Sequence, residues 1–365
     1  MRRRGTLQNP TNRFERLRYV PPDRGDPAAV ASGTETDPDL EPDPDEGAID
    51  PRTEYLRDPS RTIIATNSSP DVGFDASVNP YRGCAHGCSY CYARPHHEFL
   101  GWSAGLDFET RILVKERAPE LLRRKLAQPR WKPQVVAFSG VTDPYQPAER
   151  RFRITRGCLE VLAAFRNPVG LITKSSLVAR DLDLLAELAR WNAASVVLSV
   201  TTLDEALARR MEPQAANPRK RLWAIERLAE AGVPVGVNVA PIVPGLTDHE
   251  MPSILEAAAS AGAGFAGMVM LRLPHGVKEI FSGWLEEHAP DRRTKVLNRL
   301  KEMRGGKLYD ARFGVRGRGE GVYATQLRSV FGVACRRHGL APKGPDLSSE
   351  HFRVPGATTQ LSLFT

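Results

Sequence analysis

Three cysteines lie in one short loop of this 365-residue chain, in the run Gly-Cys-Ala-His-Gly-Cys-Ser-Tyr-Cys-Tyr-Ala at residues 83–93. They are Cys84, Cys88 and Cys91, in the spacing Cys-x3-Cys-x2-Cys. A closed structural metal site needs four ligands, whereas three thiolates can hold three corners of a cubic iron–sulfur cluster and leave one iron open. An open iron can bind and reduce a small molecule. The loop therefore predicts redox chemistry at a [4Fe–4S] cluster.

A zinc site is the main alternative, because His86 lies inside the loop and His96 and His97 follow it. A zinc site usually takes its further ligands from a second cysteine pair or a histidine pair, and the other cysteines, Cys158 and Cys335, are isolated. The odd number of cysteines, five, and the lack of a secretory signal disfavour a disulfide framework. We therefore expect a reducing, cytoplasmic environment.

Composition limits the partners of the chain. The sequence has no apolar run of about 20 residues, so we expect no membrane-spanning segment. The formal net charge is +8 and comes mostly from arginine. This charge permits a nucleic-acid partner without establishing one.

Short apolar runs rich in β-formers alternate with longer amphipathic stretches from about residue 75 onwards. The predicted strands are 77–81, 134–139, 169–173, 195–201, 233–240 and 267–271. Helices are predicted between them, for example at 179–191 and 219–231, where apolar residues recur at three- and four-residue steps. Such alternation implies parallel strands with right-handed crossovers. The cysteine loop follows the first strand and so falls at the carboxyl ends, where α/β barrels place their active sites.

The two ends of the chain have a different character. We expect residues 1–60 to be disordered, because acidic residues that alternate with proline cannot form a core. Residues 61–275 should form the barrel, and 276–340 a helical, basic extension that covers its mouth, with residues 341–365 as a loosely ordered tail. The extension holds candidate substrate contacts that can approach phosphates or stack on bases, namely Tyr309, Phe313, Arg316 and Arg318.

The cysteine spacing, with Gly87 inside it and Tyr90 before the last cysteine, resembles the signature of the radical S-adenosylmethionine (radical SAM) enzymes. Segments 79–93, 142–145, 199–213 and 240–245 are similar to the spore photoproduct lyase-like branch, over about residues 60–335. The resemblance implies an α/β fold, a partial (β/α)6 barrel. It also implies reductive cleavage of SAM to methionine and a 5′-deoxyadenosyl radical, which abstracts hydrogen from a substrate. Flavodoxin or ferredoxin as electron donor and a nucleic-acid substrate, as in a DNA-repair lyase, are further implications.

Polar residues after the later strands are candidates for binding SAM. Thr142 and Asp143 could accept hydrogen bonds from its amine, although Asp143 could instead cap the next helix. Lys174 could pair with its carboxylate. Ser199, a hydroxyl at a strand end, is a further cofactor candidate. Glu212 and Arg221 could bind the cofactor or position each other. Ile242 is a candidate for apolar contact with the adenine. After the last strand, Arg272 and His275 are candidates for substrate contact.

One position departs from the resemblance. The photoproduct lyase carries a hydrogen-donating cysteine just before its Ser/Thr-Asp-Pro triplet, and Gly140 stands there in this chain. Either Tyr90, Tyr92 or another residue relays the hydrogen, or the substrate is not a thymine dimer. Two alternatives follow: a radical SAM enzyme that modifies a protein or small metabolite, and a zinc- or cluster-binding protein without catalysis.

Overall fold

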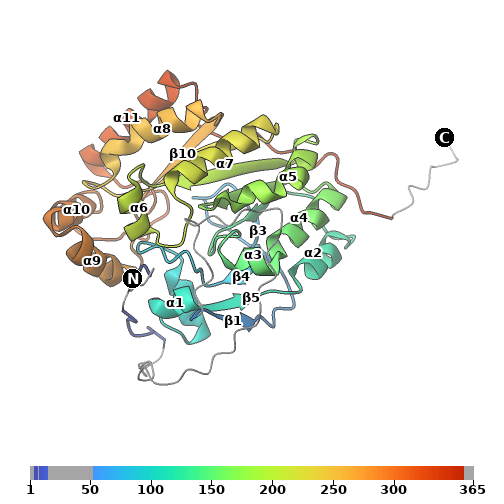
Figure 1. The fold of residues 1–365 in the computed structure, drawn as a ribbon, viewed down its shortest axis with the longest axis horizontal. Helices are drawn as coiled ribbons and strands as arrows, with labels where there is room; N and C mark the ends of the chain where they lie inside the picture. Colours follow the sequence, from blue (N-terminus) through green and yellow to red (C-terminus); the bar gives the residue numbers. More distant parts are fainter. Residues whose placement is uncertain (1–3, 7, 15–51, 357–365) are drawn as a thin grey trace.

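The computed structural model of the chain describes residues 4–6, 8–14 and 52–356, and its centre is one large sheet (Figure 1). Within these residues the sheet has seven strands in the order β10-β9-β8-β7-β6-β3-β2. The strands that pair in parallel are β3 (Ala76–Val78), β6 (Val136–Phe138), β7 (Val169–Thr173), β8 (Ala194–Val200), β9 (Val235–Ile242) and β10 (Phe265–Met270). Strand β2 (Ile64–Thr66) pairs antiparallel at the edge. The predicted parallel strands are therefore confirmed.

Helices follow the parallel strands and cover the outer face of the sheet (Figure 1). They are α2 (Ala118–Leu126), α3 (Ala148–Phe152), α4 (Ile154–Phe165), α5 (Leu182–Ala189), α7 (Pro218–Glu230) and α8 (Met251–Ser260), with short 3-10 turns η2 (Ser176–Asp181) and η3 (Asp248–Glu250). Helix α6 (Glu205–Met211) instead packs against the cysteine loop. The strands read as nearly continuous apolar runs because both of their faces are covered, and Val196, Leu198 and Val237 are fully buried. This repetition of strand and helix is the predicted partial (β/α)6 barrel.

A small second sheet was not predicted. It joins β1 (Glu54–Arg57), β5 (Arg111–Val114) and β4 (Tyr81–Arg82). Strand β1 lies inside the span expected to be disordered, and its order comes from parallel pairing with β5, a partner far along the chain. Residues 4–6 and 8–14 also pack on the fold rather than being disordered: Thr6 and Asn12 are buried, and Ser103 Oγ donates to the carbonyl of Pro10 at 2.6 Å. The rest of the acidic, proline-rich stretch lies outside the described residues.

The carboxyl region is helical, as expected, and adds α9 (Val277–His288), α10 (Pro290–Glu302) and α11 (Gly321–Arg337). Helix α11 lies beside α8 (Figure 1). The described part of the tail, residues 341–356, differs from the expected loose order. The amide of Ser348 donates to Asn192 O and that of Arg353 to Phe165 O, each at 2.9 Å. No helix among the described residues has both the length and the apolar character needed to cross a membrane.

Candidate active site

The cysteine loop starts where β4 ends, on the side of the sheet that carries the carboxyl ends of the strands. Gly83 and Gly87 have φ values of 79° and 66°, so both turns use the left-handed region that glycine adopts at little cost. Cys84 and Cys88 are buried, and the partly exposed Cys91 packs against the separate apolar clusters of each. Cys91 thus lies between the other two cysteines in the packing of the loop.

Arg94 holds the loop from inside. Its side chain is completely buried, just after the last cysteine, on the 3-10 turn η1 (Arg94–Leu100). Its Nε and Nη2 donate to the carbonyl of Cys88 at 3.0 and 2.8 Å, and Nη2 also reaches the carbonyl of Gly87 at 3.2 Å. Nη2 also pairs with Glu109 Oε1 at 2.5 Å, from the end of α1 (Leu106–Thr110). The guanidinium therefore fixes the backbone at the second cysteine, over Gly87 and Cys88.

Several other elements also fix the loop. The side chain of Gln146 accepts from Ala85 N at 2.9 Å and donates to Gly83 O at 3.1 Å. The amide of Ser89 donates to Met211 O, at the end of α6, also at 2.9 Å. Gly5 N donates to Glu109 Oε2 at 3.0 Å, so the amino-terminal segment packs against the same support. Contacts far apart in the sequence therefore set the shape of the loop.

Burial makes two of the loop thiols hard to ionise in the metal-free protein. Burial and the charge of Glu212 raise the pKa of Cys88 well above its ordinary value, and burial chiefly raises that of Cys91. A bound cation offsets this cost, because a coordinating thiol is deprotonated. Among the described residues, no three His, Cys, Asp or Glu side chains converge closely enough to hold one ion. Ligands of a cubic cluster bind different irons and need not converge on one point.

Asp143 holds His86 inside the loop. The ring of His86 is buried, and Nδ1 lies 3.5 Å from Asp143 Oδ2. Burial opposes protonation, yet the charges of Asp143 and Cys84 raise the pKa of His86 to about 10 in the metal-free protein. The loop and the turn after β6 are therefore joined by this pair.

A buried polar network lies beside Cys88 at the carboxyl ends of β8 and β9. The hydroxyl of Tyr90 donates to Glu212 Oε1, which also accepts from Thr201 Oγ1 at 2.7 Å. Arg221 Nη2 pairs with Glu212 Oε2. Burial opposes ionisation of Glu212, but the charges of Arg221 and Lys174 lower its pKa to about 2. Glu212 is therefore an ionised anchor for the Tyr90 hydroxyl and the loop that carries it.

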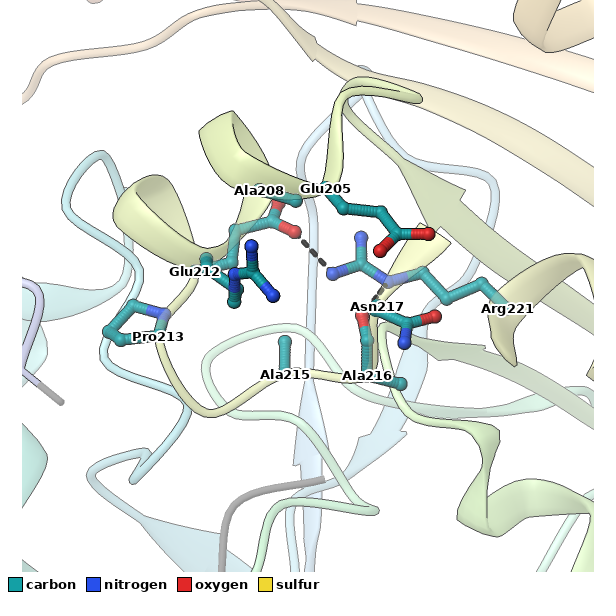
Figure 2. Close-up of a pocket in the computed structure, with 9 residues that line it drawn as sticks. Glu205, Ala208, Glu212, Pro213, Ala215, Ala216, Asn217 and Arg221 are labelled. Atoms are coloured by element: carbon teal, nitrogen blue, oxygen red, sulfur yellow. Dashed lines mark hydrogen bonds and ion pairs between the residues drawn. The ribbon is translucent and has the colours of Figure 1, made fainter. Parts of the chain in front are cut away.

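Figure 2 shows Glu212 and Arg221 pointing toward each other beside a small cavity of about 100 Å³ between α6 and α7. Typical small-molecule pockets measure roughly 300–1,000 Å³, so this cavity is too small for a nucleoside-sized ligand. Arg221 also donates from Nε to Ala216 O and from Nη1 to Ser199 O, at 2.7 and 2.9 Å. Of the two roles left open for this pair, positioning each other is the one this geometry favours.

Lys174 and Asp143 meet at the end of β7. Lys174 Nζ donates to Ala240 O at 3.1 Å, and its other two N–H groups form no hydrogen bond with the described residues. The Asp143 oxygens accept from Thr173 Oγ1, Lys174 N and Tyr145 N, at 2.7, 2.8 and 2.9 Å. These bonds organise the loop after β6. They differ from the predicted helix cap, because the next helix begins after Pro147 without a side-chain cap.

The remaining predicted residues are distributed around the same edge of the sheet. Thr142 is buried, with its hydroxyl donating to Tyr81 O at 3.3 Å. Ser199 and Ile242 are buried near the ends of β8 and β9. Tyr92 is 42 % exposed, and its hydroxyl donates to Gly140 O at 2.7 Å. Tyr92 therefore reaches the position that lacks the cysteine.

Sequence reasoning missed three residues that organise the site: Arg94, Gln146 and Thr201. Only Arg94 carried a signal, as a charged residue three positions after the last cysteine and just before a proline. Its burial depends on Glu109, which is fifteen residues away. No local pattern reveals such a pairing.

Comparison with known proteins agrees with this geometry. The family model of the radical SAM superfamily matches residues 78–258. The Mycobacterium tuberculosis (strain ATCC 25618 / H37Rv) protein Rv2578c is 37% identical over 244 residues, which are 66% of this chain and 71% of the relative. A protein named Radical SAM Nalpha-GlyT isomerase from Pseudomonas phage M6 is 26% identical over 175 residues, 47% of this chain and 34% of that protein.

Solved structures show the same fold. Spore photoproduct lyase complexed with dinucleoside spore photoproduct superposes with a TM-score of 0.57 and 16% identity, covering 79% of this chain and 81% of that one. A second structure of that enzyme, with AdoMet and dinucleoside spore photoproduct bound, gives a TM-score of 0.57 at 15% identity, covering 79% and 80%. On the family match, the close relative and the fold, the chain belongs to the radical SAM superfamily.

Proposed function

We propose that Cys84, Cys88 and Cys91 hold a [4Fe–4S] cluster at which the chain cleaves SAM to start hydrogen abstraction from a nucleic-acid substrate. The observation that carries this proposal is the buried loop that gathers three thiols, and no fourth close ligand among the described residues, at the carboxyl ends of parallel strands. When bound, the cluster supplies an electron, delivered by a flavodoxin or ferredoxin, that splits SAM into methionine and a 5′-deoxyadenosyl radical.

The protein's own residues position these groups. Lys174 is half-buried and keeps two N–H groups that suit the methionine carboxylate. Because Asp143 is held by its neighbours, we assign it the positioning of Lys174 and His86. Thr142 and Asp143 also accept hydrogen bonds from the SAM amine. Ile242 and the backbone after β9 suit the adenine, while Glu212 and Arg221 hold Tyr90 and Ser199 in place.

The substrate class rests on two supports. The solved neighbour is complexed with a dinucleoside, and the extension that follows the barrel carries arginines and exposed aromatic rings. Phe313, for example, is 57% exposed, with the Arg316 guanidinium 4.5 Å from its ring centre. Such groups suit phosphates and unpaired bases.

The reaction differs from that of the lyase in its hydrogen return. Cys158 and Cys335 are buried in the large core cluster, so neither offers a thiol to the site. Tyr92 contacts Gly140 O, and Tyr90 is fixed to Glu212. Tyr92 is therefore our candidate for a hydrogen relay, with its O–H as donor and a tyrosyl radical as the product that the electron donor must reduce.

Anaerobic reconstitution tests the proposal. The protein should bind four irons per chain, absorb near ~400 nm and release 5′-deoxyadenosine from SAM once reduced. Changing any one of Cys84, Cys88 or Cys91 to Ala should abolish both iron binding and SAM cleavage, whereas Cys335→Ala, the matched control, should keep both. Colourless protein that binds one zinc would contradict the proposal.

A further inference from the structure

The carboxyl-terminal segment 312–317 bridges the two edges of the large sheet. At one edge, the amide of Met270, the last residue of β10, donates to Gly317 O at 2.9 Å. At the other edge, the loop after β2 supplies Asp71, which accepts from Gly314 N at 2.6 Å and pairs with Arg316. Strands β10 and β2 are the edges of the sheet. The segment therefore crosses the open side of the partial barrel, next to its mouth.

Arg272 lies at this mouth over the ring of Tyr92. It follows β10, and its guanidinium carbon lies 4.6 Å from the ring centre of Tyr92, the residue after the last cysteine. It forms no hydrogen bond or ion pair with any residue that the structure describes, and its Nε is shielded from solvent. A guanidinium carries five N–H donors, and a shielded donor without an acceptor is costly. The side chain is thus prepared for an acceptor that the described residues do not supply.

The surroundings of Arg272 are positive. Arg304 is buried and donates to the carbonyls of Leu271 and Leu308 rather than to a carboxylate. Burial lowers the pKa of Arg304 to about 10, and the charge of Arg272 contributes to this decrease. The carboxylate of Asp71 is close enough to feel Arg272, but Arg316 and Gly314 already occupy it. An anion at Arg272 would therefore meet uncompensated positive charge.

Exposed aromatic rings flank the same place. Tyr92 is 42% exposed below Arg272, and Phe313 is 57% exposed beside Arg316. An acidic peptide could satisfy the guanidinium but has no bases to stack on such rings. A nucleic acid provides both a phosphate for the fork of N–H donors and flat bases for the rings.

We propose that Arg272, above Tyr92 and beside Arg316, is a subsite that binds a backbone phosphate of a single-stranded nucleic acid at the barrel mouth. This inference rests on the proposed function, since it names the group of the substrate that the mouth recognises. It places the substrate strand next to the cysteine loop, within reach of the Tyr92 hydroxyl.

The test is the affinity of the full-length, reconstituted protein for a fluorescein-labelled oligothymidylate of about ten nucleotides, measured by anisotropy. Arg272→Gln should weaken binding about tenfold, the usual loss for one charge-assisted hydrogen-bonded contact. The slope of log affinity against log salt should become shallower by about 0.7, the share of one single-strand phosphate. Arg124→Gln is the matched control: Arg124 is an exposed arginine of α2, and its removal should change neither quantity.

Separate readouts keep the two proposals apart. SAM cleavage by the wild-type protein without nucleic acid tests the proposed function, and a lack of cleavage would refute it. The affinities for oligothymidylate test the subsite independently of that result. Thermal unfolding confirms that Arg272→Gln is folded, as expected for a side chain without bonds to the chain. Equal oligothymidylate affinity for wild type and Arg272→Gln would overturn the subsite. So would a loss of affinity confined to a labelled oligoglutamate peptide, which would indicate a protein carboxylate instead.

Discussion

The strongest test of how the cysteine loop is built is the substitution Arg94→Met. The methionine keeps the apolar volume of the side chain but removes every hydrogen bond that Arg94 donates. The side chain of Glu109 is also fully buried, and it would keep the hydrogen bond from the amide of Gly5. Burial already raises the pKa of Glu109 even with Arg94 present. The substitution therefore leaves a buried carboxylate that must either stay charged at high cost or take up a proton.

The expected magnitude follows from this geometry. Removing one partner of a buried ion pair costs about 3–5 kcal/mol. The carbonyls of Cys88, Ala104 and Gly105 also lose their donors, so we expect a loss of at least ~4 kcal/mol in the free energy of unfolding. This is a large share of the roughly 5–15 kcal/mol that a typical protein has.

Urea unfolding of the cluster-free protein measures this loss, with iron content after reconstitution as a second readout. Arg94→Met combined with Glu109→Gln should recover about 2 kcal/mol, because no buried charge remains. In the single variant, the folded pKa of Glu109 is raised further, so stability is present at low pH and lost as pH rises through that pKa. Arg117→Met, at an exposed pair with Glu120, is the control and should leave unfolding unchanged. A single variant within ~1 kcal/mol of wild type, or a double variant no more stable than the single, would refute the reasoning.

Three further predictions concern other buried groups. Burial lowers the pKa of His97 to about 3, so as pH falls below about 6.5 the unfolded chain takes up a proton that the folded chain does not. Between pH 7 and 5 the free energy of unfolding should therefore fall by about 2 kcal/mol more in the wild type than in His97→Gln. An equal fall in both proteins, measured by urea unfolding, would contradict this. Gly87→Ala places a methyl group 2.8 Å from a carboxylate oxygen of Glu109, at a residue with positive φ, and should lose iron binding. Gly232→Ala is the control, because nothing lies within 4 Å of the added methyl group there. Equal iron content in the two variants would argue against a crowded loop. Tyr90→Phe removes a donor from Glu212 and should cost about 1–3 kcal/mol in urea unfolding, with no change as the opposing result.

The sequence alone determined the repeated units of this protein. Strand 169–173 and helix 219–231 could be predicted because a strand covered on both faces is a continuous apolar run and an amphipathic helix repeats at three- and four-residue steps. The cysteine loop could be predicted for a similar reason, since its ligands lie within eight residues and their spacing is itself the signal. The resemblance drawn from that loop to the radical SAM enzymes is confirmed by the family match.

Only the tertiary structure decided which polar residues cooperate. Glu212 could bind a cofactor or Arg221 on sequence grounds, and burial of both side chains together favours the pair. Nothing in the sequence distinguishes Arg94 from Arg272. In the structure, Arg94 is enclosed by carbonyls and Glu109, whereas Arg272 lies over the Tyr92 ring with no hydrogen-bond acceptor among the described residues. Packing distant segments together sets both burial and the supply of acceptors. Neither quantity is written in the neighbouring residues, because each depends on partners that the chain brings together only when it folds.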